Sequence, residues 1–345
     1  MSAAPNPLGK PLAGSRQLRH RHRYGSQDGF FHAIAANAAL WPDAAAFNPV
    51  PSEELSPDRG EESAPIRALL VNAHPDDESE SAALVYRLTH ELGATVDQVV
   101  VTNGEGGHQY TALAEAYYRL PLTTATNKHE LLAQIRRDEL IRSSRILGIR
   151  HSYFLDQKDT GVTLNMADAL EAWDVARIRR ELQLLLQFER YDLVLLLLPA
   201  PDTHGHHQTI AALTLETVGE LEAGDRPAAL GVRTSASADE TPAAFSQLGD
   251  YPATRTSDPA PVWSFDRRTP MSCHPQLDHR IVVNWVISEH KSQGFFQMEG
   301  CRRTHENFWL FEVSGEAGAA RWRDILHQLE LRGIASTPEL GAHAV

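Results

Sequence analysis

The chain of 345 residues has very little cysteine: Cys273 and Cys301 are its only two, and they form no CxxC pair. Two cysteines cannot build the disulfide framework of a small secreted domain, so a reducing, cytoplasmic setting is the default expectation. A single disulfide between these two residues stays open on the sequence alone.

The sequence also lacks long apolar runs and an excess of positive charge. Its longest apolar run, LVLLLLPA at 193–200, has the length of a strand and stops at a proline, whereas a membrane-spanning helix needs about 20 apolar residues. No apolar segment follows the basic residues near the N-terminus, so no secretory signal is expected. With 45 acidic against 32 basic residues, the net charge of −13 speaks against a nucleic-acid partner.

The composition changes near residue 65. Residues 1–65 mix proline, alanine and serine with acidic clusters, which is typical of a partly irregular N-terminal extension. The main domain is expected over 66–345. It would consist of a core at 66–220, a loop-rich insertion at 225–260 that could lie over the active site, and a C-terminal part at 261–345.

Within the main domain, apolar segments of strand length alternate with segments whose apolar residues recur at helical spacing. This alternation indicates βαβ units, so we predict an α/β fold: a Rossmann-like, mostly parallel sheet with helices on both faces. Three polar segments each follow a predicted strand: HPDDE at 74–78, TNGEGG at 102–107 and PDTHGHH at 201–207. They should therefore meet at the carboxyl edge of the sheet, where ligands bind in such folds.

Two of these segments are suited to hold a metal ion. His74 and Asp77 stand three positions apart where a strand turns into a helix, and THGHH at 203–207 supplies three histidines from a second loop. Two histidines and one carboxylate, with a position left for water, form a catalytic zinc site that suits the hydrolysis of an amide. Asp76 is then placed to take a proton from the water. Iron or manganese could occupy the same ligands.

Together the motifs resemble those of the PIG-L/LmbE family of metal-dependent N-acetylglucosaminyl deacetylases. The resemblance runs from about Arg67 to Gly219, with weaker similarity up to about residue 313. It implies the same Rossmann-like fold. The segments that carry it are AHPDDE at 73–78 and HGHH at 204–207, supported by TNGEGG, by RRDELIRSSRILGI at 136–149 and by HKSQG at 290–294.

Carried over residue by residue, the resemblance implies a zinc site and two catalytic groups. His74, Asp77 and His207 would be the zinc ligands, and Asp76 the general base. His204, three positions before His207, matches the family histidine that stabilises the tetrahedral oxyanion and protonates the leaving amine.

Three further residues are expected to contact the substrate. Arg136 matches the family arginine that contacts the sugar or its phosphate-side substituent. Asp159 follows a predicted strand and could touch substrate hydroxyls, although an Asp before Thr-Gly also suits a turn. His290, in HKSQG, fits either the pocket wall or a helix C-terminus, where the helix dipole favours a positive side chain.

One position departs from the family pattern. The residue just before the ligand histidine is often Asp, which orients the catalytic histidine, and here it is His206. What orients His204 is therefore open, with Asp202 as a candidate. Glu78 also has two interpretations: it contacts a metal ligand, or it is the first-turn acid of the following helix, which is slightly favoured.

These patterns lead to a metal-dependent hydrolase that deacetylates an N-acetylglucosamine-type amide, with zinc as cofactor. Its partner would be a small N-acetylated amino sugar or glycoconjugate. An amidase that acts on a larger amide, such as a thiol-sugar conjugate or an acylated antibiotic, is the alternative among hydrolases. A non-catalytic binding module on the same fold is a third hypothesis, whereas a phosphohydrolase with an Asp nucleophile lacks its DxDxT context. The sequence leaves the oligomeric state open, a homo-oligomer included.

Overall fold

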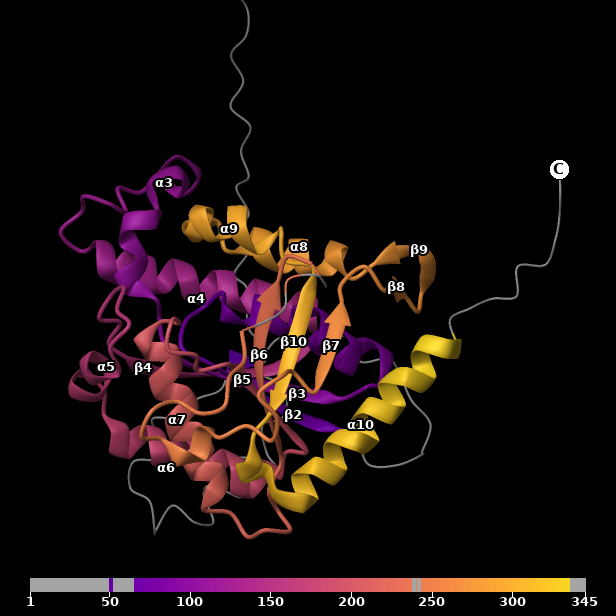
Figure 1. The fold of residues 1–345 in the computed structure, drawn as a ribbon. Helices are drawn as coiled ribbons and strands as arrows, with labels where there is room; N and C mark the ends of the chain where they lie inside the picture. The colour runs from indigo at the N-terminus through magenta and orange to yellow at the C-terminus, as the bar shows by residue number, and fades with distance from the viewer. Residues whose placement is uncertain (1–49, 52–64, 238–239, 241–242, 336–345) are drawn as a thin grey trace, which may run out of the picture. The chain divides into compact units, whose positions relative to one another are not determined.

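The structure of the chain is a computed structural model that describes residues 50–51, 65–237, 240 and 243–335 (Figure 1). Most of the N-terminal extension expected over 1–65 lies outside these residues.

An eight-stranded sheet forms the centre of the described chain (Figure 1). Five neighbouring strands run parallel in the order β4-β3-β2-β5-β6. Antiparallel strands complete both edges, β1 beside β4, and β10 followed by β7 beside β6. The strands are β1 (Val50–Pro51), β2 (Arg67–Asn72), β3 (Thr95–Thr102), β4 (Ile149–Gln157), β5 (Leu193–Leu197), β6 (Ala228–Ser235), β7 (Trp263–Asp266) and β10 (His305–Leu310), while β8 (Pro270–Met271) and β9 (His274–Asp278) form a separate pair.

Helices connect the parallel strands and cover both faces of the sheet, which confirms the predicted α/β fold. The longer helices are α4 (Lys128–Leu147), α6 (Val175–Glu189), α7 (Gly205–Gly219), α8 (Arg280–Glu289) and α10 (Gly315–Ala335). The shorter ones are α2 (Ala82–Tyr86), α3 (Ala112–Tyr118), α5 (Met166–Ala172) and α9 (Gly294–Gly300). Single turns are η2 (Asp77–Ser81), η3 (Arg87–Glu91), η4 (Glu105–Tyr110), η5 (Pro252–Thr254), η6 (Lys291–Gln293) and η7 (Glu312–Ser314).

Two hydrophobic cores lie on the two faces of the sheet. Successive side chains of a strand point to opposite faces, so β2 supplies Leu69 and Val71 to the core beneath α5, α6 and α7. It supplies Ala68 and Leu70 to the core beneath α2, α8 and α10. All four are at most 1% exposed, and burial of a leucine or valine side chain contributes about 1.5–3 kcal/mol. These cores fix the position of β2, the strand that carries HPDDE.

The strand order reverses between β2 and β5. From β2 the chain proceeds through β3 to β4 on one side, whereas β5 and β6 lie on the other side. Connections that leave these two strands in opposite directions open a crevice beyond their carboxyl ends, where α/β proteins bind ligands. HPDDE follows β2 and PDTHGHH follows β5, so the topology places both motifs at this crevice.

The segment 225–260 differs from the loop-rich insertion expected there. Residues Ala228–Ser235 form β6, which pairs in parallel with β5 and antiparallel with β10. The strand was hidden because alanine and glycine, which are common in its first half, have low strand propensity. Its burial between two neighbouring strands outweighs that propensity, and the described residues between β6 and 260 include the short turn η5.

Two sequence expectations concern features away from the crevice. Cys273 and Cys301 are both exposed and free, so the disulfide left open by the sequence is not formed. Among the described residues, no helix is long and apolar enough to cross a membrane.

Candidate active site

The HPDDE motif follows the end of β2, and its backbone is strained at Asp76. Asp76 has a φ of 112°, in the left-handed region that L side chains rarely adopt. Its backbone N–H donates to Glu78 Oε2 at 3.0 Å. A residue in such a conformation costs about 1–3 kcal/mol and persists where neighbouring contacts hold it, as is common at functional sites.

Three side chains from the two motifs converge at the crevice. His207 Nε2 lies 3.1 Å from His74 Nδ1 and 3.1 Å from Asp77 Oδ1, and His74 Nδ1 lies 3.7 Å from Asp77 Oδ2. Asp77 Oδ2 also accepts the backbone N–H groups of Ala73 and His74, each at 2.9 Å, which fixes the carboxylate at the strand end. Two imidazole nitrogens and one carboxylate oxygen gathered in this way are a suitable donor set for one divalent cation.

A second group of three donors shares His74 with the first and adds His204 and His206. It contains no carboxylate, whereas the first group contains Asp77. His206 Nδ1 lies 2.9 Å from His74 Nε2, and His204 Nδ1 accepts the backbone N–H of His206 at 3.1 Å. The group that contains Asp77 is therefore the better cation site.

The electrostatics of that site favour positive charge between its members. Burial alone would raise the pKa of Asp77, but His207 and His74 outweigh it and hold the pKa well below its ordinary value. Burial would lower the pKa of His74, yet Asp77 outweighs this effect and raises it. The site thus keeps a buried carboxylate ionised, and such a carboxylate attracts a cation.

A second imidazole holds His74 from its other side. His206 is fully buried, with Nδ1 2.9 Å from His74 Nε2 and Nε2 2.7 Å from Thr160 Oγ1. Burial and the charge of His74 lower the pKa of His206 to about 3, so its ring is neutral. We assign its proton to Nε2, which donates to Thr160, so that Nδ1 accepts from His74 Nε2–H. This leaves the His74 Nδ1 lone pair facing the cation site, the orientation that supporting residues give to metal-binding histidines.

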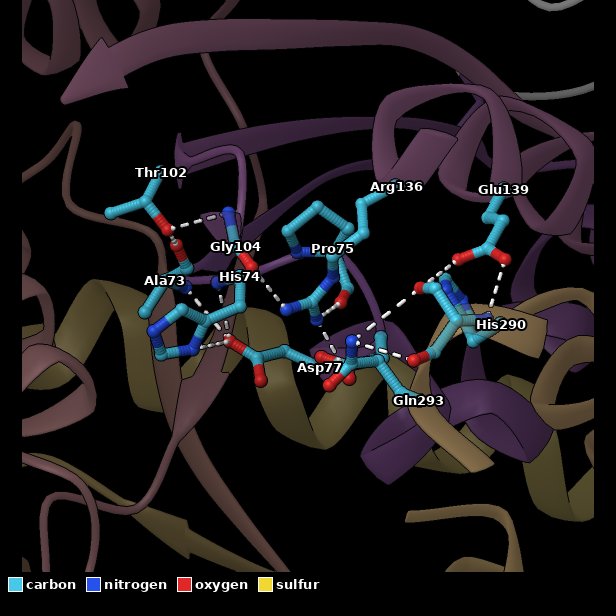
Figure 2. Close-up of polar contacts among 12 residues, drawn as sticks. Ala73, His74, Pro75, Asp77, Thr102, Gly104, Arg136, Glu139, His290 and Gln293 are labelled. Carbon is cyan, nitrogen blue, oxygen red and sulfur yellow. Dashed lines mark hydrogen bonds and ion pairs between the residues drawn. The ribbon is translucent and has the colours of Figure 1, made fainter. Parts of the chain in front are cut away.

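Asp76 lines the same crevice and is held by a buried arginine. Arg136, on α4 and only 3% exposed, places Nη2 2.8 Å from Asp76 Oδ2. Its Nη1 donates to Gly104 O at 2.8 Å, and Nη2 also donates to Pro75 O (Figure 2). Burial raises the pKa of Asp76 to about 6, although Arg136 acts in the opposite direction. Both Nη atoms of Arg136 thus have protein partners, yet Arg136 also lines the cavity, so the substrate contact expected from the sequence stays a prediction.

The glycine-rich segment TNGEGG makes room for this arginine. Gly104 has a φ of +68°, and a Cβ atom on it would lie 2.2 Å from Arg136 Nη1. A side chain would strain the backbone there and displace the guanidinium group as well. The absence of a side chain at Gly104 therefore leaves the space in which the Arg136 guanidinium group reaches Asp76.

His204 begins α7 and lies against the cation site. Its ring centroid is 4.9 Å from that of His74 and 5.6 Å from that of His207. Because Nδ1 accepts the His206 N–H, the proton of the neutral ring is on Nε2. Burial and the charges of His74 and His207 lower the pKa of His204 to about 4. At neutral pH this ring is therefore a hydrogen-bond donor without charge.

Asp202 does not orient His204. Both oxygens of Asp202 accept from Arg233, at 3.0 and 2.9 Å, and its side chain is 65% exposed. The backbone of the first turn of α7 orients His204 instead, through the hydrogen bond from His206 N–H.

His290 differs from the expectation that it contacts substrate. It is fully buried, and its Nε2 lies 2.5 Å from Glu78 Oε1, which Ser143 also contacts. Glu78 is an acid of the first turn of η2, as favoured from the sequence, and it is fully buried, where it joins HPDDE to α4 and to HKSQG. Gln293, three positions further on, lines the crevice instead (Figure 2). The HKSQG motif was the sequence signal for it, but the motif did not say which of its polar side chains faces inward.

Asp159 lines the crevice, as expected, and also orders the loops around it. Its Oδ2 accepts the N–H of Gly106 at 3.0 Å, and its Oδ1 accepts the N–H of Gly161 at 2.8 Å. The same Oδ1 lies 3.8 Å from His206 Nδ1. The turn and the pocket interpretations of this residue therefore both apply.

These side chains surround a cavity of about 250 Å³. Its wall combines the cation site with Asp76, Arg136, Asp159 and His204. Sequence reasoning missed several other wall residues, because an isolated acidic or apolar residue gives no signal of its own: Glu80, Tyr110, Val162, Leu197 and Phe296.

Comparison with solved structures finds proteins of different activities. An N,N'-diacetylchitobiose deacetylase from Pyrococcus horikoshii is 17% identical, with 85% of this chain and 95% of that chain covered and a TM-score of 0.44. The 4-carboxy-2-hydroxymuconate hydratase of Pseudomonas putida KT2440 is 14% identical, with coverages of 71% and 95% and a TM-score of 0.47. A deacetylase of teicoplanin biosynthesis is 14% identical, with coverages of 71% and 98% and a TM-score of 0.44.

Comparison with protein families gives a match to the PIG-L family, described as GlcNAc-PI de-N-acetylase, over residues 69–218. This range contains both motifs that build the cation site, together with Asp76, Arg136 and His204. Residues 69–218 thus match the PIG-L family model, as the motifs predict.

Proposed function

We propose that the protein is a metal-dependent hydrolase that removes the acetyl group from an N-acetylated amino sugar. The observation that carries this proposal is the convergence of a three-residue cation site, a strained Asp76 and a neutral His204 on one cavity. The family description, GlcNAc-PI de-N-acetylase, favours the amide of an amino sugar as the scissile bond.

His74, Asp77 and His207 would hold the ion, and the donor set fits it, because an ionised carboxylate and two imidazole nitrogens face one point. Zinc is the expected metal, and iron or manganese accepts the same ligands. A divalent cation bound there supplies positive charge that polarises a carbonyl group and lowers the pKa of water.

Asp76 acts as the general base. Arg136 holds Oδ2, so Oδ1 is the oxygen that accepts a proton from the attacking water. A carboxyl group with a pKa of about 6 is ionised at neutral pH and is a stronger base than an exposed Asp. The water oxygen forms a bond with the acetyl carbon as its proton moves to Asp76.

His204 donates a hydrogen bond from Nε2–H to the carbonyl oxygen, where negative charge develops. Its low pKa favours this role over protonation of the amine, because a neutral imidazole is a weak acid. Asp76 therefore returns its proton to the leaving nitrogen when the C–N bond breaks. The products are acetate and the free amino sugar.

The test is an acetate-release assay with the full-length, zinc-loaded protein and a panel of N-acetylated sugars, free and aglycone-linked. We expect release from at least one member of the panel. His207→Ala should lose both zinc and turnover, whereas His327→Ala, which removes an exposed histidine on α10, should change neither. Silence across the panel with zinc bound would contradict deacetylation of amino sugars and favour a larger amide or a binding module.

A further inference from the structure

Glu78 is a fully buried carboxylate that contacts the backbone of Asp76 but does not line the catalytic cavity. Its Oε2 accepts the Asp76 N–H at 3.0 Å. Its Oε1 accepts from the Ser143 hydroxyl and lies 2.5 Å from His290 Nε2. Both carboxylate oxygens therefore have protein donors, and the proposed reaction gives Glu78 no step of its own.

The pair of Glu78 and His290 is a poor source of stability. Both side chains are 0% exposed, and the removal of two such groups from water costs free energy that their mutual attraction recovers only in part. Apolar residues of similar volume often stabilise a buried position as well as an ion pair does. The reason for a carboxylate at this position is therefore to be found in the group that it contacts, the N–H of Asp76.

Asp76 has an exceptional backbone conformation. Three other non-glycine residues of the described chain have positive φ, with values of 48° to 56°, in the ordinary left-handed range. The φ of Asp76, 112°, lies far outside that range. Such a conformation persists only where surrounding contacts hold it.

The contact with Glu78 is suited to hold this conformation. A hydrogen bond from a backbone N–H to a carboxylate is stronger than one to a neutral acceptor, and its free energy is of the same order as the strain of one such residue. Rotation about the N–Cα bond of Asp76 would change the direction of its side chain relative to the peptide group before it. The position of the N–H thus determines whether the Asp76 side chain points into the cavity.

Arg136 acts on the other end of the same residue. Its Nη2 lies 2.8 Å from Asp76 Oδ2, so it holds the carboxylate but not the backbone N–H. Glu78 holds the backbone N–H but not the carboxylate. Both contacts are needed to fix the position of Oδ1, the oxygen that takes the proton in the proposed reaction.

We propose that Glu78 is a positioning residue for the general base: its carboxylate, which Ser143 and His290 orient, holds Asp76 in the conformation that directs its side chain into the catalytic cavity. The proposal rests on the proposed deacetylase function, in which Asp76 takes the proton, and adds the group that fixes its backbone. It also gives His290 a role that acts through Glu78 and not through the substrate.

The test uses three variants of Glu78 in the zinc-loaded, full-length protein. Glu78→Met keeps the length of the side chain but offers no acceptor to the Asp76 N–H, and Glu78→Asp keeps the charge but is too short to reach both His290 and Asp76. Glu78→Gln keeps an oxygen that can accept this N–H. We expect kcat to fall by about 10²-fold in the Met and Asp variants, with KM within about twofold of the wild type, because a displaced base acts on the transition state. The Gln variant should keep kcat within about tenfold of the wild type.

The control is Asp97→Val, which removes another fully buried carboxylate. Asp97 lies in the first half of β3, away from the carboxyl edge of the sheet, and accepts from Arg150 and Tyr191. This variant should unfold at a lower urea concentration and keep the wild-type kcat. Wild-type kcat in the Met or Asp variant, a Gln variant as slow as these two, or an equal loss of kcat in Asp97→Val would each overturn the proposal. If the Met variant does not fold, the comparison of Asp with Gln decides.

Crystal structures of the variants separate this proposal from the proposed function. If the wild type releases no acetate from any sugar, the φ of Asp76 is still measurable. It should be positive in the wild type and in the Gln variant, and negative in the Asp and Met variants. An unchanged positive φ in the Asp and Met variants would show that Glu78 does not hold Asp76 and would refute the proposal, whatever reaction the protein catalyses.

Discussion

His206 Nδ1 lies 2.9 Å from His74 Nε2, and Thr160 Oγ1 lies 2.7 Å from the other nitrogen of His206. A neutral imidazole thus supports the predicted metal ligand at a position where the family often has Asp. His206→Leu should weaken zinc binding by about 10–100-fold, as is typical when such support is lost. His206→Asn should lose less, because the amide oxygen of Asn can accept a hydrogen bond near the position of Nδ1.

Competition with a chromophoric chelator measures both zinc affinities. Thermal unfolding of the metal-free proteins is the companion measurement, because a general loss of stability would affect both variants alike. Wild-type zinc affinity in the Leu variant would show that His206 does not support His74.

Arg136 is predicted to position Asp76. Arg136→Lys keeps the positive charge but cannot reproduce contacts with Asp76, Gly104 and Pro75 together. We expect kcat to fall by about 10²-fold or more, with KM nearly unchanged, because a misplaced base acts on the transition state. Arg137→Lys is the matched control, since the Arg137 side chain is 34% exposed and pairs with Asp156. A raised KM with an unchanged kcat would instead indicate direct substrate binding by Arg136.

Alanine variants of Gly104 and Gly161 distinguish two effects of an added side chain: strain in the backbone and displacement of Arg136. Both have positive φ, +68° and +85°, but only Gly104 faces Arg136, since nothing lies within 4 Å of a Cβ atom on Gly161. Gly161→Ala should therefore cost only the local strain, about 1 kcal/mol. Gly104→Ala should reduce the free energy of unfolding, measured with urea, by more than Gly161→Ala does. It should also lower kcat. Equal losses of stability and activity in the two variants would contradict the role assigned to Gly104.

Because of Glu91, we expect the free energy of unfolding to decrease as the pH falls through the acidic range. Its carboxylate accepts from Arg87 Nε at 2.8 Å and lies 3.5 Å from His279 Nε2. Burial would raise the pKa of Glu91, but its interactions with His279 and Arg87 outweigh burial and lower the pKa from 4.5 to about 2. The resulting stabilisation is complete above about pH 4.5, the pKa in the unfolded chain, and disappears as the pH falls through 2.

Urea unfolding of the metal-free protein from pH 7 to pH 3 tests this dependence against Glu91→Gln. At pH 7 the wild type should be more stable by about 1.5–3 kcal/mol, the contribution of hydrogen bonds to a charged group, and the difference should shrink below pH 4.5. Glu330→Gln, at an exposed position of α10, should show no such trend. A constant difference for Glu91→Gln across this range would refute the assignment.

The sequence was sufficient to predict the mostly parallel sheet and the meeting of His74, Asp77 and His207, whose roles as metal ligands stay predictions. Alternating strand and helix patterns predicted the parallel sheet, and the motifs after two of its strands predicted that His74, Asp77 and His207 would meet. The strand β6 was missed because its alanines and glycine disguise a buried strand. Its burial depends on neighbours that are distant in the chain.

The sequence could not predict the directions in which the side chains of the site point. Arg136 and His290 are near the crevice, as expected, but one is turned toward Asp76 and the other toward Glu78. These directions follow from packing between α4, HKSQG and HPDDE, which no local pattern encodes. A second cavity beside the site is lined in part by β6, where the sequence predicted only a loop.

The most direct test of the account measures acetate release and bound zinc together in Asp76→Asn. Asn keeps the size of Asp76 but cannot take a proton from water, so release per bound zinc should fall by about 10²–10⁴-fold. Zinc binding should stay at the wild-type level, because His74, Asp77 and His207 are unchanged. Acetate release at the wild-type rate by this variant would contradict the assignment of Asp76 as the base and, with it, the proposed mechanism.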